Sequence, residues 1–312
     1  MTKKNLILGG VLAVLVLSAY IFNGPFAEWK KNLNRPKNFV SGFQVGDINK
    51  IEIEKDGKKI NIEKAEVSTG STTEDRWKIS GTKDFYLTKE ATDKITTSVR
   101  ELLAAKLDLI SENKDKKKDF EVDGAGTKIL LKNGDNVEAD FIVGKMTSDY
   151  AGVFISKGDL DKIYSVKIMA LNFAFSEDNI YNKSIFKTDI EKINKIRFQY
   201  PGQEFTIEKK NNQWVGTSPK SFAINKSKID GVIKILADLT AADIPEQTFK
   251  GTGLEKHEII VQVTGDGVDN TIIIGNKNDK GLYYAKTGKS DNIYLLNKDS
   301  RDGLNKKIQD LK

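Results

Sequence analysis

One segment of the sequence occurs twice, and this repetition limits the possible folds more than any other feature. The segment INKIEIEKDGKKINIEK at positions 48–64 returns as INKIRFQYPGQEFTIEK at positions 193–209, without a gap and at one offset (193 − 48 = 145). Trp77 then corresponds to Trp214 and Ile163-Tyr164 to Ile293-Tyr294, in unchanged order. Copies that start 145 residues apart are domain-sized, unlike the short repeats of solenoids. The sequence therefore predicts two copies of one domain.

The duplication divides the 312 residues into four parts. We expect an N-terminal membrane anchor at 1–22, a juxtamembrane linker at 23–47, a first repeat domain at 48–187 and a second at 188–312. A prior of roughly 100–200 residues per domain agrees with two domains. Hydrophobic residues make up 38% of the chain and charged residues 30%, which is the balance of a folded domain.

The predicted anchor is Leu6–Phe22, which carries no charge and follows Lys3 and Lys4. A helix of this length spans roughly 26 Å, at the short end of what a bilayer core of about 30 Å accepts. A cleavable signal peptide is the alternative, but small residues are missing two positions before Ala19 and before Ala27. We therefore favour an uncleaved, single-pass anchor that contacts the lipid bilayer.

The charges around this anchor favour one orientation. The cations after it outnumber those before it, and counting them alone favours a cytoplasmic body; they are Lys30, Lys31, Arg35 and Lys37. Trp29, between Pro25 and Pro36, is typical of a side chain that rests among lipid headgroups.

Each copy begins with a pattern typical of a β-hairpin. Isoleucines alternate with polar residues around Asp56-Gly57, and the second copy repeats the alternation around Pro201-Gly202. A third strand follows at Trp77 and at Trp214. We expect both tryptophans to be core residues that fill the space between the hairpin and the next helix.

A helix and more strands follow in each copy. Apolar residues at helical spacing predict helices over 88–107 and 226–239, capped by Thr88 and Asn225. Four strands are then expected in each copy, at 128–132, 138–143, 153–156 and 162–166, and at 258–263, 270–274, 282–285 and 292–296. The predicted fold is α+β: two tandem copies of an antiparallel sheet with a helix.

Composition removes several kinds of chemistry. The chain has no cysteine, which excludes disulfides, thiol nucleophiles and cysteine-ligated zinc. Its net charge is +6, but acids alternate with the lysines and only Lys114–Lys118 is locally basic, so we expect no nucleic-acid partner. That run is most simply a solvated loop.

No motif marks an active site. His257 is the only histidine, so a zinc site would need carboxylates as its other ligands. A serine–histidine–acid triad built on His257 stays open as an alternative, although no Gly-x-Ser-x-Gly elbow accompanies it. The acids of 266–270 lack the spacing of a calcium loop and indicate a hairpin turn, while Gly251-Thr252-Gly253 lacks the third glycine of a dinucleotide loop. We therefore expect no catalytic, cofactor-binding or metal-binding residues and no cofactor.

The second copy carries a resemblance to a known family. Trp214-Val215, Pro219, Ala223, the helix over 226–239 and Ala241-Ala242-Asp243 together resemble domain-of-unknown-function family 4340. The connector at 179–186 is similar too. The first copy departs from the pattern, because no proline follows Trp77 and a polar stretch at 68–74 precedes it.

The resemblance implies a location and a role. Family members resemble auxiliary domains beside gliding-motility-type ABC transporters, which implies a body outside the cytoplasmic membrane, contrary to the charge count. It brings no catalytic residues. The first hypothesis is a non-enzymatic, membrane-anchored accessory or scaffold of a transporter permease or another envelope complex. The alternative is an anchored envelope hydrolase that uses carboxylates.

Overall fold

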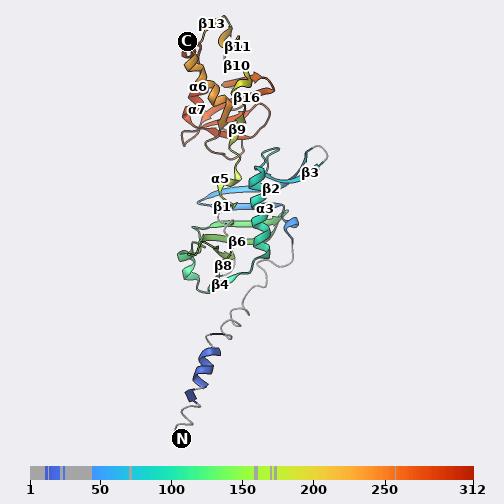
Figure 1. Cartoon of the computed structure of the whole chain (residues 1–312), viewed down its shortest axis with the longest axis vertical. Coiled ribbons are helices and arrows are strands. Elements are labelled where there is room, and N and C mark those ends of the chain that lie inside the picture. The colour runs from blue at the N-terminus through green and yellow to red at the C-terminus, as the bar shows by residue number, and fades with distance from the viewer. Residues whose placement is uncertain are drawn as a thin grey trace. The chain divides into compact units, whose positions relative to one another are not determined.

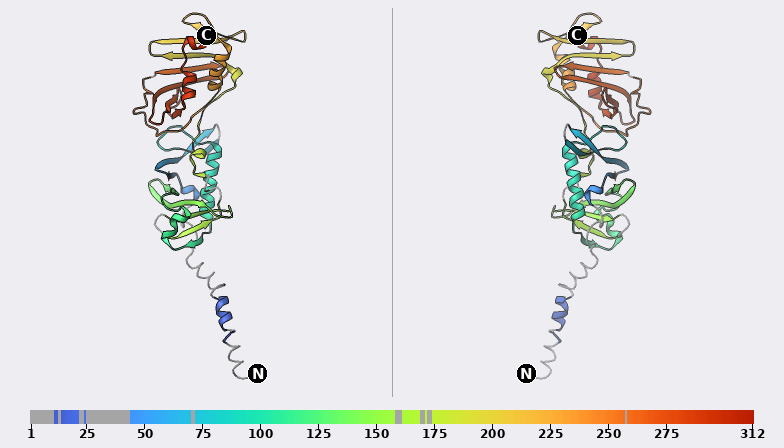
Figure 2. Two further views of the ribbon diagram at one scale, coloured as in Figure 1. Left: turned by 90° about the vertical axis from the view of Figure 1, so that its left-hand side faces the viewer. Right: turned by 90° about the vertical axis from the view of Figure 1, so that its right-hand side faces the viewer.

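The computed structural model describes residues 11–12, 14–21, 24, 44–69, 72–157, 161–168, 171, 174–256 and 258–312 (Figures 1 and 2). The chain divides into two compact units. The first consists of Met1–Trp77 with Thr88–Ile180, and the second of Lys78–Leu87 with Tyr181–Lys312. Ten residues from within the first sequence copy, 78–87, therefore belong to the second unit.

The first unit is built on an eight-stranded sheet in the order β3-β2-β1-β5-β6-β7-β8-β4. In this order, each neighbouring pair from β2–β1 to β8–β4 is antiparallel. The helix α3 (Lys89–Ala104) lies along one face of this sheet (Figures 1 and 2). The strands are β1 (Lys50–Lys55), β2 (Lys58–Thr69), β3 (Thr72–Ile79), β4 (Asp108–Ser111), β5 (Thr127–Asn133), β6 (Asn136–Met146), β7 (Val153–Lys157) and β8 (Ile163–Val166), and the short helices are η1 (Val45–Asp47), η2 (Lys114–Phe120) and α5 (Glu177–Ile180).

The second unit holds another antiparallel eight-stranded sheet, β13-β12-β11-β10-β15-β16-β17-β18. Two further strands, β9 (Ser184–Lys187) and β14 (Asp238–Thr240), pair with each other. The remaining elements are η3 (Ile190–Lys192), β10 (Ile193–Tyr200), β11 (Gln203–Lys210), β12 (Gln213–Ser218), β13 (Phe222–Ala223), α6 (Lys226–Ala237), β15 (Ile259–Gly265), β16 (Val268–Lys277), β17 (Tyr283–Thr287), β18 (Ile293–Leu296), α7 (Lys298–Leu304) and α8 (Ile308–Leu311).

Seven strands have the same order in both sheets. The run β3-β2-β1-β5-β6-β7-β8 of the first sheet matches β12-β11-β10-β15-β16-β17-β18 of the second. The predicted α+β class with antiparallel sheets is confirmed. The hairpin turns lie where the sequence predicted them: Asp56 and Gly57 both have positive φ (51° and 75°), which is the geometry of a type I′ turn, and Gly202 has φ 73° after Pro201.

Both long helices start at the predicted caps. The Thr88 hydroxyl accepts a hydrogen bond from the Ala91 N–H at 3.1 Å, and the Asn225 side chain accepts one from the Ser227 N–H at 3.0 Å. Both helices end earlier than predicted, at Ala104 and Ala237. In the second unit the reason is clear, because the next residues become β14 and pair with β9.

The two equivalent tryptophans lie in different environments. Trp77 is buried, with 3% of its surface exposed, and donates its indole N–H to the Thr96 hydroxyl on α3 at 3.3 Å. Trp214 is only half-buried and packs against the edge of the second core. The core prediction is confirmed for Trp77 and wrong for Trp214.

Residues 78–87 form a small hairpin inside the second unit. Lys78 bridges Tyr86, and the Ile79 N–H donates to the Phe85 carbonyl at 2.9 Å. Phe85 is buried against Ala241, Ile244 and Tyr294, and its ring centre lies 5.3 Å from that of Tyr294. The corresponding residue in the second copy is Phe222 (222 − 85 = 137, the offset of the two tryptophans).

A glycine explains why these two phenylalanines differ. The Phe222 ring covers Gly216, where an added Cβ would lie 2.1 Å from the ring, and it meets Phe205 at 6.3 Å. The first copy has Ile79 at the position of Gly216 (216 − 79 = 137). A branched side chain there occupies the space that the ring needs. Phe85 therefore packs on Tyr294 instead.

The predicted anchor Leu6–Phe22 lies partly outside the described residues. Within it, residues 11–12 and 14–21 are helical. In the described part of the chain, no helix combines the length and the apolar character needed to cross a membrane.

Candidate functional site

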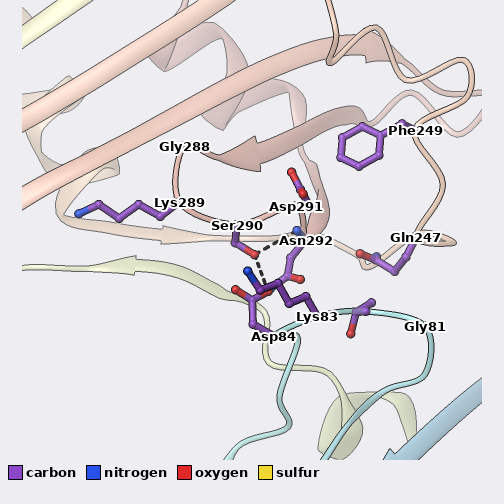
Figure 3. A pocket seen from close by; sticks show the side chains of 11 residues that line it. Gly81, Lys83, Asp84, Gln247, Phe249, Gly288, Lys289, Ser290, Asp291 and Asn292 are labelled. Atoms are coloured by element: carbon purple, nitrogen blue, oxygen red, sulfur yellow. Dashed lines mark hydrogen bonds between the residues drawn. The ribbon is translucent and has the colours of Figure 1, made fainter.

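The second unit contains a polar pocket of about 480 Å³, within the usual range of small-molecule sites. We call it the loop pocket, because it lies among three connecting segments (Figure 3). These are residues 81–84 of the inserted hairpin, the loop with Gln247 and Phe249, and residues 288–292 between β17 and β18.

Backbone and side-chain bonds fix the inserted segment. The Thr82 hydroxyl donates to the Ile79 carbonyl at 2.6 Å, and the Lys78 ammonium donates to the Thr82 carbonyl at 2.7 Å. Gly81 has φ 76°, a conformation that glycine adopts without strain. This turn presents Lys83 and Asp84 to the pocket (Figure 3).

The loop between β17 and β18 meets that turn through Ser290. The Ser290 hydroxyl donates to an Asp84 carboxylate oxygen at 2.8 Å and accepts from the Asn292 N–H at 3.2 Å (Figure 3). Lys289 is held away by Asp269, whose carboxylate lies 3.1 Å from the lysine nitrogen. One hydrogen bond thus joins a loop of the first sequence copy to a loop of the second.

The loop with Gln247 and Phe249 is held in place by contacts with Ile293 and Lys286. The side-chain amide of Gln247 accepts from the Ile293 N–H at 2.9 Å and donates to the Ile293 carbonyl at 3.0 Å, so it acts like one more strand residue beside β18. Phe249 lies under the Lys286 ammonium, 5.2 Å from the ring centre. Most polar groups of the loop pocket are therefore already engaged.

The electrostatics of the loop pocket do not favour general acid catalysis by Asp291. The Lys286 ammonium donates to Asp291 at 2.7 Å, and this bond together with the lysine charge holds the pKa of the Asp291 carboxyl below its ordinary value. A general acid at neutral pH needs a raised pKa. The Ser290 hydroxyl faces a carboxylate, without an imidazole among the described residues to accept its proton.

Those residues weighed from the sequence that the structure describes lie on separate elements. His257 lies outside the described residues. The acids of 266–270 form the turn and first residues of the β15–β16 hairpin, as predicted, and Lys114–Lys118 lies on η2 rather than in an irregular loop. In the described part of the chain, no three His, Cys, Asp or Glu side chains gather to hold a metal ion. The loop pocket residues carry no motif that could have identified them.

A family model described as "Domain of unknown function (DUF4340)" matches residues 77–252 and again residues 214–312. The chain belongs to the DUF4340 family. Each DUF4340 match begins at a tryptophan, Trp77 or Trp214, at the equivalent strands β3 and β12. No curated protein and no solved structure matches the chain.

Proposed function

We propose that this DUF4340 protein is a non-enzymatic scaffold, anchored in the cytoplasmic membrane by Leu6–Phe22, with its body on the extracytoplasmic side. Its partner is a membrane protein, the permease of an ABC-type transporter or a subunit of another envelope complex. Two domains on one short anchor hold fixed surfaces near the membrane.

The observation that carries the non-enzymatic role is the state of the polar groups in the loop pocket. Asp84, Ser290 and Asp291 are each engaged by a neighbouring side chain, at 2.7–2.8 Å. Catalytic acids and bases need tuned pKa values and access to substrate. These contacts instead brace loops, which is the role of polar side chains in a rigid binding surface.

Support for the anchor comes from the described part of residues 1–22. Its helical residues include large apolar side chains that are 46–68% exposed. They are Val11, Leu12, Val14, Leu15, Val16, Leu17, Tyr20 and Ile21. A helix that exposes apolar side chains all round is favoured in lipid rather than in water.

One observation favours an alternative, a membrane-anchored hydrolase that uses carboxylates. The loop pocket brings Asp84 and Asp291 to one cavity. Hydrolysis by paired carboxylates needs one of them protonated at working pH. The Lys286 bond, which lowers the pKa of Asp291, disfavours this carboxyl as the protonated member of such a pair.

Complementation separates the two functions. A strain lacking the protein receives the wild type, the double variant Asp84→Asn and Asp291→Asn, or the body without residues 1–22. A scaffold predicts rescue by the double variant, failure of the unanchored body, and recovery of a permease with the full chain in mild detergent. Failure of a folded, membrane-bound double variant would reject the scaffold in favour of the hydrolase.

A further inference from the structure

A second cavity in the second unit, of about 320 Å³, lies between η3, the ends of β11 and β12, and α6. We call it the tryptophan groove, because Trp214 lines it. We propose that the tryptophan groove binds a segment of a partner protein in which an apolar side chain neighbours a carboxylate. This rests on the proposed scaffold function and assigns it a contact surface.

The duplicated sequence supplies an internal comparison. In the first unit, the indole N–H of Trp77 is satisfied by the Thr96 hydroxyl. The helix position equivalent to Thr96 is Asp230 (230 − 96 = 134, the offset that relates Lys94-Ile95 to Lys228-Ile229). Asp230 is engaged elsewhere, by the Lys226 ammonium at 2.6 Å. Among the described residues, the indole N–H of Trp214 has no hydrogen-bond acceptor, so it is available to a ligand.

Apolar surface surrounds the indole. Ile190 is 44% exposed, although it is a large aliphatic residue, and it lines the groove together with Trp214. Ile193 and Ile233 are buried at the base. Tryptophan is enriched among the residues that dominate binding energy, where the surrounding contacts exclude water. This part of the groove fits the apolar side chain.

The rim of the tryptophan groove determines the charge of the occupant. Lys209 pairs with Glu191 at 3.1 Å and Lys226 with Asp230 at 2.6 Å, so both acids of the groove are neutralised. Lys234, on the exposed side of α6, is the remaining lysine of the lining and has no ion pair within the described residues. Its ammonium and the Trp214 N–H both favour a carboxylate.

A peptide supplies both features at the required spacing. Side chains of an extended segment alternate faces, and residues two apart lie about 7 Å from each other on one face. An apolar residue and an acid can therefore enter the groove together. The first unit offers no equivalent site, because Trp77 is buried.

The test uses the full chain in detergent micelles, labelled with fluorotryptophan and observed by fluorine NMR. The Trp77 and Trp214 resonances are assigned with Trp→Phe variants. The probes are two peptides with the same apolar core, acetyl-Asp-Leu-Phe-Glu-amide and acetyl-Lys-Leu-Phe-Lys-amide. We expect the acidic peptide to shift the Trp214 resonance saturably and to leave Trp77 unmoved. The basic peptide should bind at least tenfold more weakly.

A pair of surface variants provides the control. Lys234→Glu should weaken binding of the acidic peptide roughly tenfold, since it replaces an attraction by a repulsion. Lys220→Glu makes the same charge change on an exposed residue outside the groove and should leave binding unchanged. Equal binding of both peptides, equal effects of both variants, or no shift of Trp214 at about 1 mM peptide would overturn the proposal.

Recovery of a permease with the same full chain tests the proposed scaffold function independently of peptide binding. If the wild type recovers a permease but the acidic peptide does not bind, the tryptophan groove is rejected and the scaffold stands. If no membrane partner is recovered, the scaffold fails whatever the peptide does. Lys234→Glu should reduce permease recovery, while Lys220→Glu should not.

Discussion

At the residue scale, Ser98 on α3 has a buried hydroxyl without a hydrogen-bond partner among the described residues. The equivalent residue of the second unit is Val232 (232 − 98 = 134), which has no polar atom to satisfy. An unsatisfied buried polar group costs about 1–3 kcal/mol, and alanine is a better helix former than serine. Ser98→Ala should therefore raise the free energy of unfolding by about 1 kcal/mol.

Urea unfolding of the full chain in micelles measures this change. Thr96→Val is the matched control on the same helix, because it removes the hydroxyl that accepts the Trp77 N–H. It should lower stability by about 1–3 kcal/mol, since it leaves a buried donor unpaired. Loss of stability in both variants would mean that the Ser98 hydroxyl is satisfied in solution.

Tyr200 should make the stability of the second unit fall at alkaline pH. Its hydroxyl donates to the Lys306 carbonyl, and burial raises the pKa of Tyr200 to about 12 from 10.0. A raised pKa means that the folded state holds the proton more tightly than the unfolded state. The contribution is complete below pH 10 and is lost as the pH rises toward 12. Tyr200→Phe should flatten the fall in melting temperature over that interval, and an unchanged slope would contradict the assignment.

At the scale of elements, the sequence predicted those that depend on short-range signals. The period-two hairpins, the caps at Thr88 and Asn225 and the four-strand meanders were all expected, because each follows from adjacent residues. The transfer of 78–87 to the second unit was not expected. It accompanies a difference between the copies, Ile79 against Gly216, and the close approach of the Phe222 ring to Gly216 is visible only in the structure.

The sites escaped prediction for a similar reason. The loop pocket joins Asp84 to Ser290 across more than two hundred positions, and neither residue belongs to a motif. The exposure of Trp214 was also missed. Both tryptophans lie on the third strand ahead of the helix, which predicts one environment for both. The equivalent helix residues act differently, since Thr96 accepts the Trp77 indole N–H and Asp230 pairs with Lys226.

Gly216 can be tested directly as the residue that admits Phe222. Gly216→Ala places a Cβ 2.1 Å from the ring, so the ring must move away from Phe205. Overpacking of this kind typically costs about 1–3 kcal/mol. Gly231→Ala is the control: it lies in α6 with nothing near the added Cβ, and should stabilise by up to about 1 kcal/mol. Differential scanning calorimetry should show opposite shifts, and two shifts of the same sign would contradict this role of Gly216.

At the scale of the whole molecule, the side of the membrane that carries the body decides whether the scaffold proposal is sound. The cations that follow the anchor favour a cytoplasmic body, whereas the resemblance to transporter-associated domains implies an extracytoplasmic one. We give the second argument more weight, because the positive-inside rule is a bias of short flanking loops, and a large body translocates largely regardless of charge.

Protease added to intact spheroplasts should therefore digest the body while a cytoplasmic marker protein stays intact. The informative variant replaces the four cations after the anchor, Lys30, Lys31, Arg35 and Lys37, by glutamine. If the body is extracytoplasmic, the wild type and the glutamine variant should both be digested, since removal of these charges only strengthens that orientation. Protection of the wild type until lysis, with digestion of the variant, would show that charge governs the topology. The body would then face the cytoplasm, and the extracytoplasmic scaffold would be excluded.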